Sequence, residues 1–189
     1  MNKTKRKIFE TSMKLFAEKG YDATSIEEIT ATVGVAKGTL YYHFSSKEEI
    51  FNFLIEEGMK LLKNSIAIKT AGKENCLEKL KAITLIQIKI MVKYENLISI
   101  VLSQMWGNEP RNKLCQKYVL EYIKIIEEIV EDGMKNCQIE SADSAVLASE
   151  IFALTCTSLV YKIKTEKEIN INALYKEYEK TLLNKLSIK

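Results

Sequence analysis

The 189-residue chain has few of the residues that interrupt helices or build metal centres. It contains one proline, seven glycines and one histidine. A fold rich in sheets needs more turn residues than this, and a metal cluster or a histidine-dependent triad would have to be built around His43 alone. There is also no uninterrupted run of roughly 18 apolar residues, the length that a membrane helix requires. These absences favour a soluble, mostly helical, cytoplasmic protein with no metal, no cofactor and no membrane partner.

The four cysteines lie far apart and form no Cys-x-x-Cys pair. Their spacing indicates neither a zinc site nor a disulfide framework, so Cys76, Cys115, Cys137 and Cys156 are expected to be buried small apolar residues. Redox sensing by one of them stays open. Because there is no glycine-rich phosphate loop and no Gly-x-Ser-x-Gly turn, we expect no enzyme activity.

The chain does contain two short helical segments around a glycine. Ser25 can accept a hydrogen bond from an orphan backbone N–H, and Glu28 stands at the position from which a carboxylate reaches back to the cap. The helix that starts at Ser25 should end at Gly34, where a positive φ costs no Cβ clash. A second helix then begins near Ala36. Two short helices around such a turn predict a helix-turn-helix motif.

The second of these helices presents a surface suited to DNA. Leu40 and Phe44 share one face and are expected to anchor the helix in the core. The outward positions run from Lys37 to His43, where Lys37 can donate to guanine or phosphate and Thr39 can offer a hydroxyl or a methyl group. Gly38 would let backbone approach backbone closely. The alternative to DNA contact is that Tyr41 or Tyr42 is a core aromatic that packs partly inward.

Residues 2–53 resemble the DNA-binding domain of the TetR family of bacterial transcriptional regulators. The resemblance rests on Ile8 to Gly20 as the first helix and on its exit through Gly20-Tyr21-Asp22-Ala23-Thr24-Ser25-Ile26. It also rests on the run from Gly34 to Phe44 and on Ser46-Lys47-Glu48-Glu49-Ile50-Phe51. One departure is Thr30, where the family usually has alanine. The resemblance implies that Thr24 or Ser25 and Lys47 hold phosphates while the second helix enters the major groove. The expected DNA contacts are Thr24, Ser25, Val35, Ala36, Lys37, Gly38, Thr39, Tyr41, Tyr42, His43 and Lys47.

Positive charge is concentrated where this motif lies. The formal net charge is +3, with 28 Lys and Arg against 25 Asp and Glu, and residues 1–47 carry the whole excess. The basic cluster Lys3, Lys5, Arg6 and Lys7 is either a solvated end or an arm that contacts phosphate or the minor groove.

The remainder of the chain reads as helices joined by short loops. The helix that opens at Ser46, where Ser46 and Glu49 again have the spacing of a capping box, is expected to continue to about residue 66, with no linker after the motif. Further helices are expected over residues 76–93, 96–105, 110–136, 141–163 and 172–186, with Pro110 in the first turn of its helix. The predicted fold is therefore all-α, with a three-helix DNA-binding domain at residues 1–50 joined by a shared helix to a larger ligand-binding and dimerisation domain at residues 51–189.

By resemblance, the last two helices dimerise the protein and the middle helices bind a small molecule. The candidate pocket residues are aromatic, sulfur-containing or polar, and they suit an apolar or aromatic inducer; each could equally be an ordinary core residue. They are Gln87, Met91, Tyr94, Met105, Trp106, Tyr118, Tyr122, Phe152 and Thr155.

Together these expectations describe a regulator that binds a palindromic double-stranded DNA operator as a homodimer and is released by an inducer. Repression is favoured over activation because occupancy alone can block a promoter. The alternative is a helical architectural or interaction protein that binds DNA without sequence preference.

Overall fold

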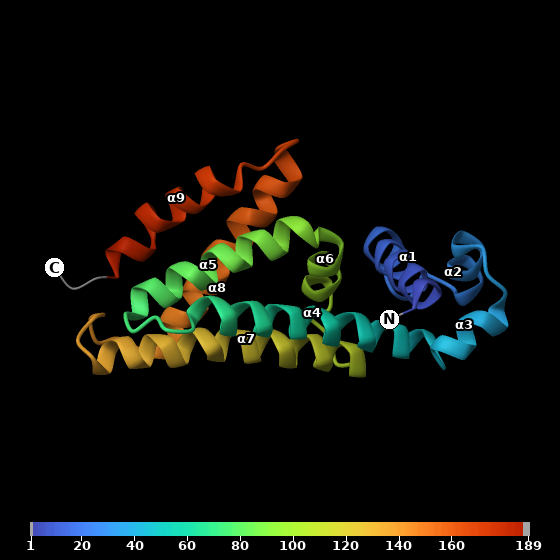
Figure 1. The fold of residues 1–189 in the computed structure, drawn as a ribbon, viewed down its shortest axis with the longest axis horizontal. Helices are drawn as coiled ribbons and strands as arrows, with labels where there is room; N and C mark the ends of the chain where they lie inside the picture. The colour runs from blue at the N-terminus through green and yellow to red at the C-terminus, as the bar shows by residue number, and fades with distance from the viewer. Residues whose placement is uncertain (1, 187–189) are drawn as a thin grey trace. The chain divides into compact units, whose positions relative to one another are not determined.

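The computed structural model describes residues 2–186, and every regular element in that range is a helix (Figure 1). This confirms the predicted all-α class. Helix starts match the expectations closely, and Pro110 is the first residue of its helix. The elements are α1 Lys3–Lys19, α2 Ile26–Val33, α3 Lys37–His43, α4 Lys47–Thr70, α5 Cys76–Lys93, α6 Glu95–Ser103, α7 Pro110–Lys135, α8 Ser144–Thr165, α9 Ile171–Thr181 and the 3₁₀ helix Leu183–Lys185.

The helices form two compact units that do not follow chain order. The first unit consists of the residues up to Lys60 together with Tyr94–Lys117, and the second of Leu61–Lys93 with the chain from Tyr118 onward. The first unit therefore adds α6 and the start of α7 to the DNA-binding helices. Helices α4 and α7 each contribute residues to both units.

Helix α1 begins at Lys3, before the expected start at Ile8. The Asn2 side chain accepts a hydrogen bond from the Lys5 N–H at 2.8 Å and so caps the helix. The basic cluster of residues 3–7 thus lies within a helix, and its contact with phosphate or the minor groove stays a prediction. The Lys5 ammonium lies 4.7 Å and 4.6 Å from the ring centres of Phe44 and Phe53, which holds it against the domain.

The predicted helix starts in the motif are confirmed. The Ser25 hydroxyl accepts from the Glu28 N–H at 3.0 Å, and the Ser46 hydroxyl accepts from the Glu49 N–H at 3.0 Å. Gly34 has φ 77° and ψ 40°, so the tight turn does use the left-handed region.

The reciprocal half of each predicted capping box is not formed. Glu28 makes an ion pair with Lys19 instead of reaching back to Ser25. The Glu49 carboxylate accepts from the N–H and the hydroxyl of Ser45, both at 2.6 Å. For Glu28 the competing donor is charged, which makes the stronger bond, and for Glu49 the residue Ser45 offers two neutral donors at once.

The core of the DNA-binding helices is built from the residues that the pattern selects. Leu40 and Phe44 are 0% and 1% exposed, which confirms them as the anchors of α3. Thr30 is also buried, and its hydroxyl donates to the Glu27 carbonyl at 2.9 Å, so this departure from the family pattern leaves no unpaired polar group.

The second unit is organised around α5, which packs against α8 and α9. Lys81 of α5 makes an ion pair with Glu179 of α9 at 3.1 Å. Helix α9 ends at Thr181, five residues before the expected end, because the chain tightens there into a 3₁₀ turn in which the Lys185 N–H donates to the Leu182 carbonyl at 3.2 Å.

Helix α8 keeps an apolar face in solvent. Val146, Leu154 and Tyr161 are 54%, 53% and 70% exposed. In length and composition this helix could cross a membrane, a test that core helices of soluble proteins also pass, and 28% of its apolar window is buried. Exposed apolar surface of this kind is typical of a face that contacts another molecule.

Three of the cysteines are buried as expected, and Cys137 is not. It lies exposed in the turn after α7, in the left-handed conformation with φ 54°.

Candidate nucleic-acid interface and ligand-binding residues

Helix α3 exposes most of the predicted reading surface. Tyr42 is 83% exposed and Tyr41 45%, so neither is a core aromatic. Tyr42 stacks edge-on against His43, with ring centres 5.0 Å apart. Ala36, Lys37 and Gly38 are also exposed, and no atom lies within 4 Å of a Cβ built on Gly38. The sequence thus identified a surface with aromatic, cationic and backbone groups available to a duplex.

Lys37 is paired within the motif. Its Nζ lies 2.5 Å from a carboxylate oxygen of Glu27 on α2. The hydrogen bond between them lowers the pKa of Glu27 and raises that of Lys37. Because both side chains are more than half exposed, the pair is worth little in water. A phosphate or a guanine can therefore compete with Glu27 for this ammonium group.

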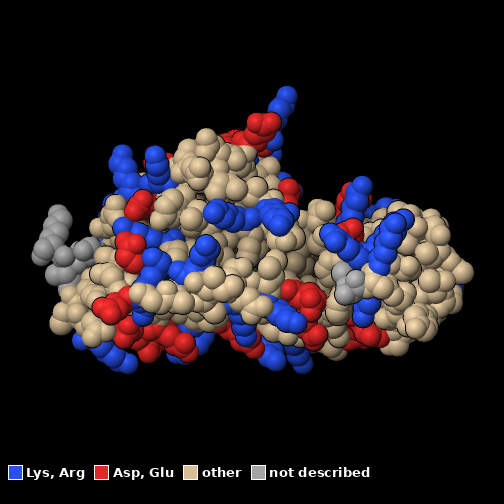
Figure 2. Space-filling view, in the orientation of Figure 1, with Lys and Arg blue, Asp and Glu red and all other residues tan. Residues whose placement is uncertain are grey.

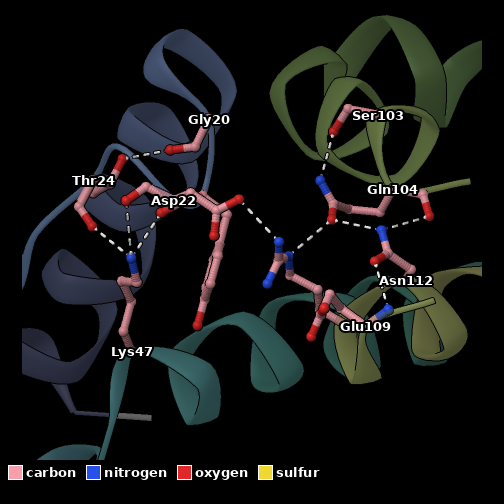
Figure 3. Close-up of polar contacts among 10 residues, drawn as sticks. Gly20, Asp22, Thr24, Lys47, Ser103, Gln104, Glu109 and Asn112 are labelled. Atoms are coloured by element: carbon pink, nitrogen blue, oxygen red, sulfur yellow. Dashed lines mark hydrogen bonds and ion pairs between the residues drawn. The ribbon is translucent and has the colours of Figure 1, made fainter. Parts of the chain in front are cut away.

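Lys47 points at the loop between α1 and α2 (Figure 3). Its Nζ donates to the carbonyls of Tyr21 and Thr24, each at 2.8 Å, and lies 4.3 Å from the Tyr21 ring centre. The Thr24 hydroxyl donates to the Gly20 carbonyl at 2.8 Å, and Thr24 is 1% exposed. Lys47 and Thr24 therefore fix this loop in the protein described here, and the predicted phosphate contacts of both stay a prediction.

Arg111, which the sequence analysis missed, holds the same loop from the other side. Its Nη2 lies 2.9 Å from Oδ2 of Asp22, and its guanidinium carbon lies 4.9 Å from the Tyr21 ring centre (Figure 3). Its Nε donates to the side-chain carbonyl of Gln104 at 3.1 Å. No local pattern could have revealed this contact, since 89 positions separate Asp22 from Arg111.

The connection between α6 and α7 that carries Arg111 is itself fixed by side-chain amides. The Asn112 amide donates to the backbone and side-chain oxygens of Gln104 at 3.1 Å and 3.0 Å, and its oxygen accepts from the Glu109 N–H at 3.1 Å. A Cβ on Gly107 would lie 2.7 Å from the Asn112 side chain. Arg111 therefore extends from a well-ordered support.

Gln87, Met91, Tyr122, Phe152 and Thr155 lie on α5, α7 and α8 within the second unit. The Tyr122 hydroxyl donates to the Gln87 side chain at 2.9 Å, and the Gln87 amide donates to the Phe152 carbonyl at 3.4 Å and lies 3.9 Å from the Met91 sulfur. Thr155 is buried and donates to the Ile151 carbonyl. Burial raises the pKa of Tyr122. The Gln87 cluster, meaning Gln87, Met91, Tyr122 and Phe152, is thus a group of aromatic and sulfur-containing side chains around a buried polar centre.

The other candidates lie elsewhere. Tyr94, Met105 and Trp106 belong to the first unit, and Trp106 is 85% exposed. Tyr118 is half-buried at the start of the second unit's share of α7. Their assignment to a ligand site stays a prediction. Within residues 2–186 no group of three or more His, Cys, Asp or Glu side chains could hold a metal ion.

Comparison with known proteins identifies the class. Residues 8–54 match the model of the bacterial regulatory proteins of the tetR family. The chain is 43% identical over 77 residues to the uncharacterised HTH-type transcriptional regulator YerO of Bacillus subtilis, and 44% identical over 52 residues to IcaR of Staphylococcus epidermidis, a negative transcriptional regulator of a biofilm operon. These matches cover 39% and 28% of this chain, and only 26% and 28% of the two relatives' own lengths.

A solved structure matches over the whole length. It is a Clostridium perfringens protein proposed to regulate fatty acid metabolism, 33% identical, with a TM-score of 0.87 over 97% of this chain and 100% of that one. Fold, motif and relatives define a helix-turn-helix transcriptional regulator and not an enzyme. The chain belongs to the tetR family.

Proposed function

We propose that this regulator is a repressor that binds a palindromic operator as a homodimer and leaves it when a small molecule binds. The observation that carries the proposal is the exposed face of α3, where Tyr42, Tyr41 and Lys37 stand clear of the core. DNA binding is assigned to residues 1–50 and ligand binding and dimerisation to residues 51–189, in the cytoplasm. The negative regulation by IcaR supports repression over activation.

The exposed face of α8 supports the dimer. Val146, Leu154 and Tyr161 recur at steps of eight and seven residues, which places them on one side of a helix. Two such faces can be buried against each other, with α9 alongside, in a four-helix bundle. A two-fold dimer doubles the base contacts and explains why a protein with a net charge of only +3 could hold its operator.

The proposed inducer is an apolar or aromatic molecule received near the Gln87 cluster. Gln87 and Tyr122 would supply its polar anchors, and Phe152 and Met91 its apolar walls. The relative proposed to regulate fatty acid metabolism is consistent with such a molecule. Ligand binding would reorient residues 46–66, and a coupling of about 1–3 kcal/mol would change operator affinity roughly 5- to 150-fold.

Fluorescence anisotropy on DNA from upstream of the protein's own gene, beside scrambled DNA, tests the DNA-binding half. The double variant Lys37→Ala, Tyr42→Ala should lose selective binding. Lys14→Ala, which removes another exposed lysine of the first unit paired with a glutamate, should retain it. Equal binding of the unaltered protein to both DNAs would establish the architectural alternative instead.

A further inference from the structure

A surface groove of about 480 Å³ lies in the second unit, away from the Gln87 cluster. It is bordered by the last turns of α4, the loop that follows, the outer side of α5 and Tyr175 of α9. On α5, groove residues such as Ala82 and Ile86 point 100° to 180° away from Gln87 and Met91 around the helix axis, because each residue turns the helix by about 100°. The groove and the cluster therefore occupy different faces of α5.

The floor of the groove is apolar. Ala82, Leu85, Ile86 and Ile90 recur every three or four positions along α5 and form a continuous stripe. Ile68 of α4 borders the same groove and is 72% exposed. An isoleucine this exposed beside an apolar stripe leaves hydrocarbon surface that a ligand could remove from water.

The rim of the groove is cationic. Four lysines and one glutamate line it. Lys81 is committed to Glu78 at 3.3 Å and to Glu179 at 3.1 Å, so it forms part of the wall. Lys69, Lys73 and Lys89 have no ion-pair partner among residues 2–186. Three uncompensated ammonium groups thus surround an apolar floor.

We propose that this groove binds a fatty acyl chain that carries an anionic head group, with the chain on the α5 stripe and the head among Lys69, Lys73 and Lys89. DNA would gain nothing from the apolar floor, because phosphate and sugar need polar partners. A second copy docked here around a two-fold axis would place like charges against each other. A single amphiphilic anion satisfies both halves of the groove.

This inference goes beyond the proposed function, because it adds a second ligand site to the one proposed at the Gln87 cluster. Calorimetric titration without DNA keeps the two separate. Dodecanoyl-CoA and dodecanoate test the two sources of the anionic head. Dodecanol has the same chain without charge, and free CoA has the charge without the chain. Saturable binding of either acyl anion, at least tenfold tighter than dodecanol and CoA, is expected and would show which head group is preferred.

Substitutions place the site. Lys69→Gln with Lys89→Gln should weaken binding about 5- to 10-fold, since two exposed charge contacts are lost. Lys135→Gln with Lys167→Gln removes two exposed lysines outside the groove and should change affinity less than twofold. Equal weakening by both pairs would mean that net charge alone attracts the anion, and would overturn the site.

Ala82→Phe tests the floor, because the ring would fill the stripe without altering charge. It should abolish acyl binding, while circular dichroism and operator binding stay unchanged. Undiminished binding by a folded Ala82→Phe protein would refute the groove. So would binding of anionic phospholipid vesicles but of neither soluble acyl anion, because that result indicates a membrane surface. If an acyl anion binds as predicted and the operator complex is unaffected, the groove stands as a ligand site that is separate from the inducer site at the Gln87 cluster.

Discussion

Removing Arg111 should destabilise the protein several times more than removing its ion-pair partner. Asp22 is 78% exposed and contributes only its carboxylate, so Asp22→Ala should cost about 0.5 kcal/mol. Arg111 is 22% exposed and also makes a hydrogen bond to Gln104 and a cation–π contact with Tyr21. These add about 1 kcal/mol and about 0.5 kcal/mol, so Arg111→Ala should cost about 2 kcal/mol.

The double variant isolates the ion pair itself. The coupling energy between Asp22→Ala and Arg111→Ala should be about 0.5 kcal/mol, because the contacts to Gln104 and Tyr21 do not involve Asp22. For a chain of this size, Arg111→Ala should lower the midpoint of thermal unfolding by about 4–8 °C. Lys113→Ala, an exposed lysine two positions further along α7, serves as the control and should shift it by less than 1 °C.

Urea denaturation measures these free energies of unfolding. The protein concentration is kept fixed, because dimerisation would make the free energy of unfolding depend on it. The reasoning is refuted if Arg111→Ala costs no more than Asp22→Ala, since the ring and amide contacts would then contribute nothing. A coupling energy near 2 kcal/mol would also refute it, because the ion pair would then account for the whole effect.

Three further predictions concern the backbone and the thiols. Gly34→Ala should destabilise the protein by about 1 kcal/mol in urea denaturation because Gly34 has φ 77°, whereas Gly38→Ala, in open space within α3, should not lower stability. Ellman's reagent should label Cys137 quickly in the folded protein and the three buried cysteines only after unfolding; a second fast thiol would contradict this. Stability should fall by about 1–2 kcal/mol between pH 7 and pH 10, because burial raises the pKa of Cys115 to about 12 while the unfolded thiol titrates near 8.5. Cys115→Ala should flatten that pH dependence.

Signals that depend on neighbouring residues could be predicted from the sequence. Local effects are those of Ser25, Ser46 and Pro110, which act in the first turn of their own helix, and of Gly34, which acts through its φ angle. Such effects depend only on neighbouring residues, so the local sequence predicts them. The exposed face of α3 followed from the same reasoning, once Leu40 and Phe44 were taken as its anchors.

What the sequence could not reveal depends on residues that are far apart in the chain. The Lys47 ammonium donates to carbonyls 23 to 26 positions away in the chain, which the local sequence does not indicate. From the sequence, this lysine at a helix start was therefore predicted to hold a phosphate. The reciprocal capping bond of Glu28 failed for a similar reason, since Lys19 lies within reach of Glu28 only after α1 and α2 have packed. That of Glu49 failed locally, because Ser45 donates to the same carboxylate.

The way in which residues are divided between the two units restricts how a bound ligand could change operator binding. Residues 94–117 are compact with the DNA-binding helices, and Arg111 joins them to the loop that precedes α2. A displacement of α7 must therefore either carry this loop along or break the contacts of Arg111 with Asp22 and Tyr21. Breaking these two contacts costs about 1 kcal/mol, which lies at the lower end of typical coupling energies between sites. Among the described helices, only α4 and α7 contribute residues to both units. Each of them also carries a cation that contacts the Tyr21 ring, Lys47 from α4 and Arg111 from α7. We therefore expect this loop to respond first when the second unit binds a ligand.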